Sequence, residues 1–495
     1  MRKRDGCGAV PDNGFRQIVQ PGHTLCDVDG AWMGVWACGL PDGEPAVTFG
    51  KCVALALSLM ILGQAYLVRR YVGTWLFPAC LFGLFWFGFT FFPLAILFWV
   101  PVNPWATGFL FVCSVAFSMG SLAFDWKAAF AKNAVEGETA IYGSKFLNGA
   151  FYVFTLSALL FLILNLFVQG FSLRDFFFDL YASADAYANL VVAEDFKTNI
   201  FDQWSLIFTY LGAILGGLLF SCSPSKGRRW LIVVLSFLPP TVVALTQTVK
   251  GHLFLCLVFF YAGMLIHRIS TGKLYLFERR HIRLLAGCGV VLIVIASVAF
   301  VSRGMQKVED TEDLRELLLP HFASYSCAHL YAFSDWFAFA NGMRSQLIYP
   351  HESAGYGFYT FMAPFQWLGN HRVAPSGIFD QYFFYGDLLT GNIYTMFRGL
   401  IQDFGMIGGV GFMVVAGFLL HWNFYRMLGD KWPAFTVAAF VFMLGYFYTS
   451  FVISLLIWNR IYVAFALLWV VLQINKRITQ TEGRRLAMTM ETAAQ

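Results

Sequence analysis

The stretch LNGAFYVFTLSALLFLILNLFVQ, residues 147–169, decides the fold class because it carries no charged side chain and is long enough to cross a bilayer. A membrane-spanning helix needs about 20 predominantly apolar residues. Similar apolar runs occur at 49–68, 75–99, 105–124, 204–222, 230–249, 251–267, 284–302, 404–422, 434–450 and 457–474. The sequence therefore predicts an all-α polytopic membrane protein with about eleven transmembrane helices.

The overall composition agrees with immersion in lipid. Of the 495 residues, 58% are hydrophobic and only 13% are charged, and the mean hydropathy is +0.62. Soluble domains usually carry about 25% charged residues. With 55 Phe in the chain and little polar surface to coat it, the composition excludes a cytosolic enzyme, a nucleic-acid binder and a disordered scaffold.

The basic residues mark the cytoplasmic side of the membrane. They gather in alternate connections and in the C-terminal tail: Arg69, Arg70, Lys226, Arg228, Arg229, Arg268, Lys273, Arg279, Arg280, Arg283, Arg426, Lys431, Lys476, Arg477, Arg484 and Arg485. The connection 170–203, on the other side, is rich in Asp and Glu. This alternation predicts a C-terminus inside and an N-terminus outside, although Arg2, Lys3 and Arg4 favour the cytoplasm for the N-terminal tail.

These boundaries predict five regions of the chain. Residues 1–47 form an N-terminal tail of unclear role. Residues 48–302 hold helices one to eight, with a smaller outer loop at 170–203. Residues 303–403 form one large periplasmic loop, residues 404–474 hold helices nine to eleven, and residues 475–495 form a cytoplasmic tail.

The large loop is the main candidate for function, because structureless connections longer than about 15 residues are uncommon unless they are functional. It contains Trp336, Trp367 and many Tyr and Phe. Apolar residues recur at helical spacing over 313–340. We therefore expect short helices lying on the outer membrane surface, either as a site or as a lid without chemistry.

Charged residues at membrane depth cost roughly 2.5–3.5 kcal/mol each and are functional candidates. Lys250 and His252 lie at a tight outer turn, Arg460 lies near the outer end of the last run, and Asp403 begins the ninth. Lys250 and Arg460 taken singly could extend to the interface along their aliphatic stems. Together they place two cations where an anionic headgroup would bind.

Several glycines have helix-packing spacing, whereas metal-binding patterns are scarce in the sequence. Gly212 and Gly216 have the spacing that allows close helix packing, as do Gly405, Gly408, Gly409 and Gly411. Neither C-x-x-C nor Cys/His pairs at zinc spacing occur. A D-x-D pattern, Asp27-Val28-Asp29, falls in the N-terminal tail. We expect neither a metal nor a cofactor.

Two adjoining stretches carry a family resemblance. GNIYTMFR, residues 391–398, and IQDFGMIGG, residues 401–409, resemble the signature of Wzy-type oligosaccharide repeat-unit polymerases. Lys250-Gly251 and the segment from Ser324-Tyr325 to Ala332-Phe333 are also similar. The resemblance covers about residues 200–475 and is specific mainly over 391–412.

The resemblance implies an inner-membrane glycosyltransferase acting at the periplasmic face. Such enzymes transfer a growing glycan from undecaprenyl pyrophosphate to the non-reducing end of another lipid-linked repeat unit. Their substrates are lipid-linked oligosaccharides, and a chain-length regulator could be a protein partner. Arg398 matches a pyrophosphate-binding arginine by motif, whereas Arg303, Arg372 and Arg460 match by location only; Asp403 matches the D-F-G acid, which could also cap a helix.

The chemistry of such a transfer suggests which residue types to seek. Planar guanidinium groups bind phosphate oxygens bidentately, and cations placed where charge develops lower the barrier. The candidate pyrophosphate ligands are Lys250, Arg303, Arg372, Arg398 and Arg460. Candidates for the base are Asp403, His371, Asp387, Asp380 and His321, of which the first three are preferred. Candidates for saccharide binding are Tyr325, Asn392, Tyr394 and Trp367.

Two other functions remain open from the sequence. An O-antigen ligase would share the donor chemistry but transfer finished glycan to another acceptor. A transporter or flippase for lipid-linked saccharide would need a polar cavity inside the helical bundle, and few charges lie inside the predicted spans.

Overall fold

The computed structural model describes residues 44–135, 140–171, 199–247, 250–277, 311–343, 354–370, 379–429 and 434–494, together with residues 174, 186, 187, 287, 290, 349 and 372. For residues 44–47, 132–135, 140, 141, 311–319 and 483–494 it describes the backbone alone. All described residues belong to one compact unit, 44–495. The predicted N-terminal tail, apart from its last four residues in the first helix, lies outside the described residues.

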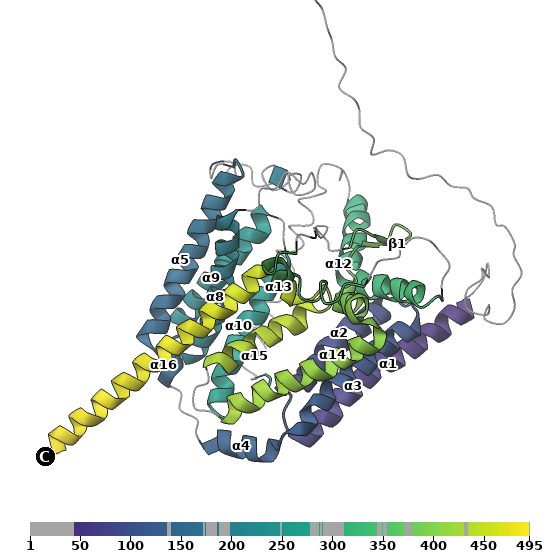
Figure 1. The fold of residues 1–495 in the computed structure, drawn as a ribbon. Helices are drawn as coiled ribbons and strands as arrows, with labels where there is room; N and C mark the ends of the chain where they lie inside the picture. Colours follow the sequence, from purple (N-terminus) through teal and green to yellow (C-terminus); the bar gives the residue numbers. More distant parts are fainter. Residues whose placement is uncertain are drawn as a thin grey trace, which may run out of the picture. The chain divides into compact units, whose positions relative to one another are not determined.

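The described part of the chain is built almost entirely from helices, with one two-stranded antiparallel sheet (Figure 1). The elements are α1 (Glu44–Val72), α2 (Pro78–Ile96), α3 (Pro104–Met119), η2 (Gly120–Ala123), α4 (Trp126–Val135), η3 (Ala140–Gly143), α5 (Lys145–Val168), α8 (Ile200–Cys222), α9 (Lys226–Thr246), α10 (Gly251–Ser270), α12 (Thr311–Ala340), α13 (Met362–Trp367), β1 (Phe383–Tyr385), β2 (Leu389–Gly391), α14 (Thr395–Gly429), α15 (Ala434–Thr449), η5 (Leu455–Ile457) and α16 (Asn459–Ala494).

The prediction of an all-α polytopic membrane protein is confirmed. Within the described residues, 9 helices are long and apolar enough to cross a membrane, namely α1, α2, α3 with η2, α5, α8, α9, α10, α14 and α16. The run predicted at 434–450 is α15, which is apolar but shorter. The run predicted at 284–302 lies outside the described residues except for positions 287 and 290.

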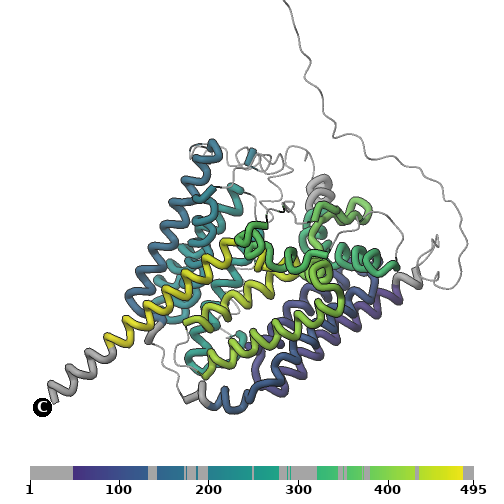
Figure 2. The backbone as a smooth tube through the Cα atoms, in the orientation of Figure 1, coloured from purple at the N-terminus to yellow at the C-terminus, as the bar shows by residue number. Residues whose placement is uncertain are grey.

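The helices run between two ends of the bundle (Figure 2), and hydrogen bonds identify which helix termini share an end. At one end, which we call the inner end, bonds join Thr74 to Leu274 and Ser144 to Asn475. At the opposite end, the outer end, bonds join Asn165 to Asn199, Asn103 to Ser334 and Met396 to Ser450. The connections rich in Lys and Arg, which the sequence assigns to one side of the membrane, lie together at the inner end of the bundle.

Glycines allow several helices to approach closely, as predicted for α8. A methyl group on Gly216 would overlap the hydroxyl of Ser236 in α9, and one on Gly212 would lie 3.1 Å from Thr155 Oγ1 in α5. Gly417 of α14 meets the backbone of Phe117 in the same way, whereas Gly411 has nothing within 4 Å. Small residues therefore set the spacing between helices at selected positions only.

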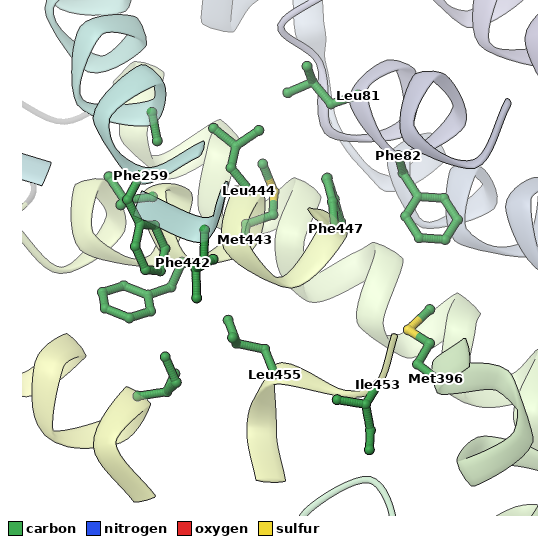
Figure 3. Packing of buried hydrophobic residues seen from close by; sticks show 14 of the residues in the cluster. Leu81, Phe82, Phe259, Met396, Phe442, Met443, Leu444, Phe447, Ile453 and Leu455 are labelled. Atoms are coloured by element: carbon green, nitrogen blue, oxygen red, sulfur yellow. The ribbon is translucent and has the colours of Figure 1, made fainter. Parts of the chain in front are cut away.

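Aromatic side chains fill the space between the helices. Figure 3 shows Phe82 of α2 near Phe447 of α15. It also shows Phe259 of α10 near Phe442, which belongs to α15 as well. The ring centres are 5.3 Å apart in the first pair and 5.2 Å apart in the second. α15 is thus held on two sides by rings, which gives the segments at its outer end a fixed base.

The large loop contains a helix where the spacing predicts one, since α12 covers the predicted stretch 313–340. Many side chains in its second half are buried, and the helix packs against α2, α3 and α14; its position relative to the membrane surface stays a prediction. Tyr331 donates a hydrogen bond to the carbonyl of Leu97 (2.9 Å), and Ser334 Oγ accepts one from Asn103 N–H (2.7 Å). The end of α2 leaves carbonyls without helical donors, and α12 supplies them.

The helix predicted to begin at 404 begins nine residues earlier. α14 starts at Thr395 and bends at Gly405, whose φ of 70° and ψ of 175° are accessible mainly to glycine. Asp403 therefore ends the first segment of α14 rather than beginning a helix. The motif 391–409 forms a short helical segment, a break and the start of a membrane-spanning helix.

Candidate functional site

Arg398 lies in the first turns of α14 and is almost completely buried, with 1% of its surface exposed. Its guanidinium carbon is 3.8 Å from the ring centre of Phe379 and 4.2 Å from that of Tyr394. Its Nη2 donates a hydrogen bond to Gln381 Oε1 at 2.6 Å. Rings and an amide thus surround the charge, which compensates part of its lost hydration.

Arg372 approaches the same aromatic group from the solvent side. Its Nη2 donates to the hydroxyl of Tyr359 (2.6 Å), and its guanidinium carbon lies 5.0 Å from the centre of that ring. Tyr359 stacks on Phe379, with centres 5.6 Å apart and planes at 20°. Arg372, Tyr359, Phe379 and Arg398 form a continuous arrangement that we call the arginine–aromatic stack.

Asp403 accepts hydrogen bonds from the segment that carries Tyr359 of this stack. Its Oδ1 accepts the N–H of Tyr359 at 3.1 Å. Its Oδ2 accepts both the N–H and the hydroxyl of Thr360, each at 2.7 Å. The side chain is buried, and these donors satisfy much of its capacity. The structure therefore gives Asp403 a role in fixing residues 359 and 360, and its role as a base stays a prediction.

Two further predicted cations lie at the starts of α10 and α16. Lys250 Nζ is 5.4 Å from the ring centre of Tyr325, and the guanidinium carbon of Arg460 is 5.3 Å from that of Trp458. Ser454, in the segment that leads to α16, donates to the carbonyl of Thr360 at 3.0 Å. The outer end therefore holds Lys250, Arg372, Arg398 and Arg460; Arg303 lies outside the described residues.

The predicted saccharide-binding residues divide into exposed and buried ones. Tyr325 and Trp367 are exposed, and Trp367 packs against Tyr462. Tyr394 is fully buried and donates to the carbonyl of Gln381 at 2.9 Å. Asn392 donates to the carbonyl of Phe379 at 3.5 Å. The last two residues hold the segment 379–381 beside Arg398 in this structure.

Among the remaining candidates for the base, Asp380 stands between Phe379 and Gln381 in the chain and therefore adjoins the stack. Asp380 and Asp387 are exposed, and Asp387 lies in the turn between β1 and β2. His321 is half-buried in α12, and His371 lies outside the described residues. No group of three or more His, Cys, Asp or Glu in the described part of the chain could hold a metal ion.

Sequence reasoning missed Phe379 and Gln381, which form one wall of the stack. Neither belongs to a recognisable motif, and both contact Arg398 from a position 17 or more residues earlier in the chain. The motif around Arg398 identified the charge but carried no sign of its partners.

The fold and this outer end define a polytopic all-α membrane protein with buried and exposed cations among aromatic rings at one end of its helical bundle. No family model, no curated protein and no solved structure matches this chain.

Proposed function

We propose that this protein is a membrane-embedded glycosyltransferase of the Wzy polymerase type. It would join undecaprenyl-pyrophosphate-linked repeat units at the periplasmic face of the inner membrane. The resemblance over 391–412 suggests the reaction, and the geometry of the outer end supplies the physical support for it.

The observation that carries the proposal is the arginine–aromatic stack. Arg372 is exposed, yet its hydrogen bond to Tyr359 and its contact with two rings hold the guanidinium in one place. A preorganised arginine can bind phosphate oxygens without first losing conformational freedom. Arg398 is too buried to touch a ligand in this arrangement, so we assign it the role of positioning the stack.

The chemistry needs little beyond this arrangement and two membrane-anchored substrates. A hydroxyl of the acceptor sugar loses its proton to a base as its oxygen bonds to the anomeric carbon of the donor. The bond from that carbon to pyrophosphate breaks, and the electron pair leaves on a phosphate oxygen. Arg372 would stabilise the negative charge that develops there.

The test is elongation by purified protein in proteoliposomes. The substrate is the lipid-linked repeat unit extracted from cells that lack the gene, and the products are resolved by size. We expect Arg372→Ala to lower the rate about 100-fold, in line with the loss of one preorganised donor. Arg372→Lys should recover little, because an ammonium group cannot reproduce the planar fork.

Arg70 provides the matched control, because it is an exposed arginine in the last turn of α1 at the inner end. Arg70→Ala should elongate like the wild type. If Arg372→Ala retains the full rate, the proposed role of the stack is wrong. If the wild type elongates nothing but transfers preformed glycan to another acceptor, the protein is a ligase; transport without bond formation would instead indicate a flippase.

A further inference from the structure

The hairpin formed by β1 and β2 lies against α12 (Figure 1). Its strands pair antiparallel, with Phe383 opposite Gly391 and Phe384 opposite Thr390. Directly paired residues place their side chains on the same face of a sheet, and successive residues of one strand alternate between the two faces. The hairpin therefore has two distinct faces, which differ in what covers them.

One face of the hairpin is closed by α12. Phe383 and Leu389 on this face are buried, with 9% and 0% of their surfaces exposed. The backbone N–H of Thr390 donates a hydrogen bond of 2.9 Å to Ser324 Oγ of the same helix. An isolated two-stranded hairpin is only marginally stable in water. The contacts with α12 therefore hold this hairpin in place.

The opposite face carries two exposed aromatic side chains. Tyr382 and Phe384 have 49% and 64% of their surfaces exposed, and their ring centres are 6.1 Å apart with planes inclined by 30°. Among the described residues, neither ring contacts a third ring. Thr390, which pairs with Phe384, is exposed as well. We call Tyr382, Phe384 and Thr390 the exposed hairpin face.

This face begins one residue away from a direct partner of the arginine–aromatic stack. Gln381 immediately precedes Tyr382 in the chain. Its side-chain oxygen accepts a hydrogen bond from Arg398 at 2.6 Å, and its carbonyl accepts one from Tyr394 at 2.9 Å. The strand that carries the two rings is therefore anchored both on α12 and on the stack.

Two carboxylates near the rings in the chain restrict what could cover them. Asp380 precedes Tyr382 by two residues, Asp387 lies in the turn after β1, and both are exposed. Carboxylates repel anionic lipid headgroups. The unpaired backbone groups at the edges of a two-stranded sheet cannot be satisfied in hydrocarbon. Insertion of this face into the membrane is therefore unfavourable.

A sugar ring fits this combination of groups. One face of many sugar rings presents C–H groups, which pack against the electron-rich face of an aromatic ring. The hydroxyls at the edge of the sugar can donate to carboxylates and exchange hydrogen bonds with a threonine hydroxyl. Because the hairpin is held before a ligand arrives, little conformational freedom is lost on binding.

We propose that the exposed hairpin face binds one sugar ring of the lipid-linked repeat unit. This inference rests on the proposed function and deepens it, because it gives the oligosaccharide a site separate from the pyrophosphate site at Arg372. Tyr382 and Phe384 lie outside the motif at 391–412 and are not among the saccharide-binding candidates that the sequence provides.

The experiment measures sugar binding separately from pyrophosphate binding. The probe is the free repeat-unit oligosaccharide, released by mild acid from the lipid-linked repeat of cells that lack the gene. Its binding to the full chain in nanodiscs is measured by calorimetry, and elongation is measured on the same preparations. We expect Phe384→Ala to raise the Kd of the oligosaccharide and the KM of elongation about tenfold. The kcat should change little, because a contact made equally in the ground state and the transition state contributes to binding alone.

Further variants provide the comparisons. Tyr382→Ala should behave like Phe384→Ala, whereas Tyr382→Phe keeps the ring and should recover most of the affinity. Trp105→Ala removes an exposed aromatic side chain from the first turn of α3, also at the outer end, and should leave Kd and KM unchanged. Arg372→Ala should bind the free oligosaccharide normally, because that probe lacks pyrophosphate. Since the rings at 382 and 384 are exposed, their variants should unfold at the wild-type temperature, which verifies folding.

The outcomes distinguish this inference from the proposed function. If the wild type elongates while folded Tyr382→Ala and Phe384→Ala keep its Kd and KM, the hairpin face binds no sugar and only the polymerase proposal stands. If Tyr382→Phe loses as much affinity as Tyr382→Ala, the rings are not the contact and the inference is wrong. If the wild type binds the oligosaccharide through these rings but elongates nothing, the inference stands and the polymerase proposal fails. If the wild type neither binds nor elongates, both are wrong.

Discussion

Two arginines that share one aromatic platform have different environments, and this difference divides their roles. Arg398 is enclosed by Phe379, Tyr394 and the amide of Gln381. Arg372 faces solvent and contacts the ring of Tyr359, which in turn stacks on Phe379. The buried guanidinium fixes the platform, and the exposed one is available to a ligand. Loss of Arg398 should therefore destabilise the protein, whereas loss of Arg372 should affect activity alone.

His329 of α12 is also buried, and its hydrogen bond defines its protonation state. Its Nε2 is 2.9 Å from the carbonyl of Phe89, so the neutral ring donates from this nitrogen. Its Nδ1 is buried and has no partner among the described residues. A second proton would have to be placed there without an acceptor, and burial accordingly lowers the pKa of His329 from 6.5 to about 4.

This lowered pKa predicts a dependence of stability on pH. Unfolded chains protonate His329 below pH 6.5, whereas the folded protein does so only near pH 4. Stability due to the neutral ring is therefore complete above pH 6.5 and decreases as the pH falls to about 4, by at most about 3 kcal/mol. His329→Gln should lose less stability over this range, because the amide can donate to Phe89 but does not titrate. Denaturant unfolding in detergent between pH 4 and pH 7.5 measures the difference, and equal slopes for the two proteins would contradict the assignment.

The sequence predicted the end of the bundle at which charged residues lie more reliably than it predicted the residues that contact them. Lys250, Arg372, Arg398 and Arg460 all lie at the predicted outer end, because charge patterning and the short motif are local signals. The rings of Tyr359 and Phe379 could not be assigned to these charges, since the contacts depend on how segments distant in sequence fold together. The burial of Asp403 and Tyr394 could not be predicted from the sequence for the same reason.

At the scale of helices, the lengths of the apolar runs predicted that helices exist at these places better than they predicted where each helix begins and ends. Residues 147–169 and 204–222 correspond closely to α5 and α8, because long apolar runs have few alternatives in a bilayer. The start of α14 was missed because residues 395–403 contain polar side chains and lie outside the apolar run. Packing against α12 and the segment after α15 stabilises this first part of α14.

The contact between α8 and α10 gives a prediction at this scale. A methyl group on Gly217 would overlap the carbonyl oxygen of Phe260, which belongs to the backbone and cannot rotate away. Gly217→Ala should therefore destabilise the protein by about 2 kcal/mol, as expected for an overpacked interface. Gly149→Ala in α5, where nothing lies within 4 Å, should be neutral or stabilising, because alanine favours helices. Thermal unfolding of both variants in one detergent tests this, and equal unfolding temperatures would mean that the helices can separate at little cost.

At the scale of the whole molecule, hydrogen bonds place two segments on either side of residues 278–310 at opposite ends of the bundle. Leu274, shortly after α10, is bonded to Thr74 at the inner end. Ser334 of α12 is bonded to Asn103 at the outer end. These two positions lie at opposite ends, and the sequence predicts that the apolar run 284–302 crosses the membrane between them.

Reporter fusions can test this eleven-span path. Green fluorescent protein matures in the cytoplasm, whereas alkaline phosphatase is active only after export. Fusion after Phe277 should give fluorescence and no phosphatase activity, and fusion after Met343 should give the reverse, because one crossing separates the two positions. Fusion after Val168 should export phosphatase, since α5 ends beside Asn199 at the outer end. If positions 277 and 343 both report the cytoplasm, then the end of α12 lies on the cytoplasmic side, and no periplasmic glycosyl transfer could use its polar groups.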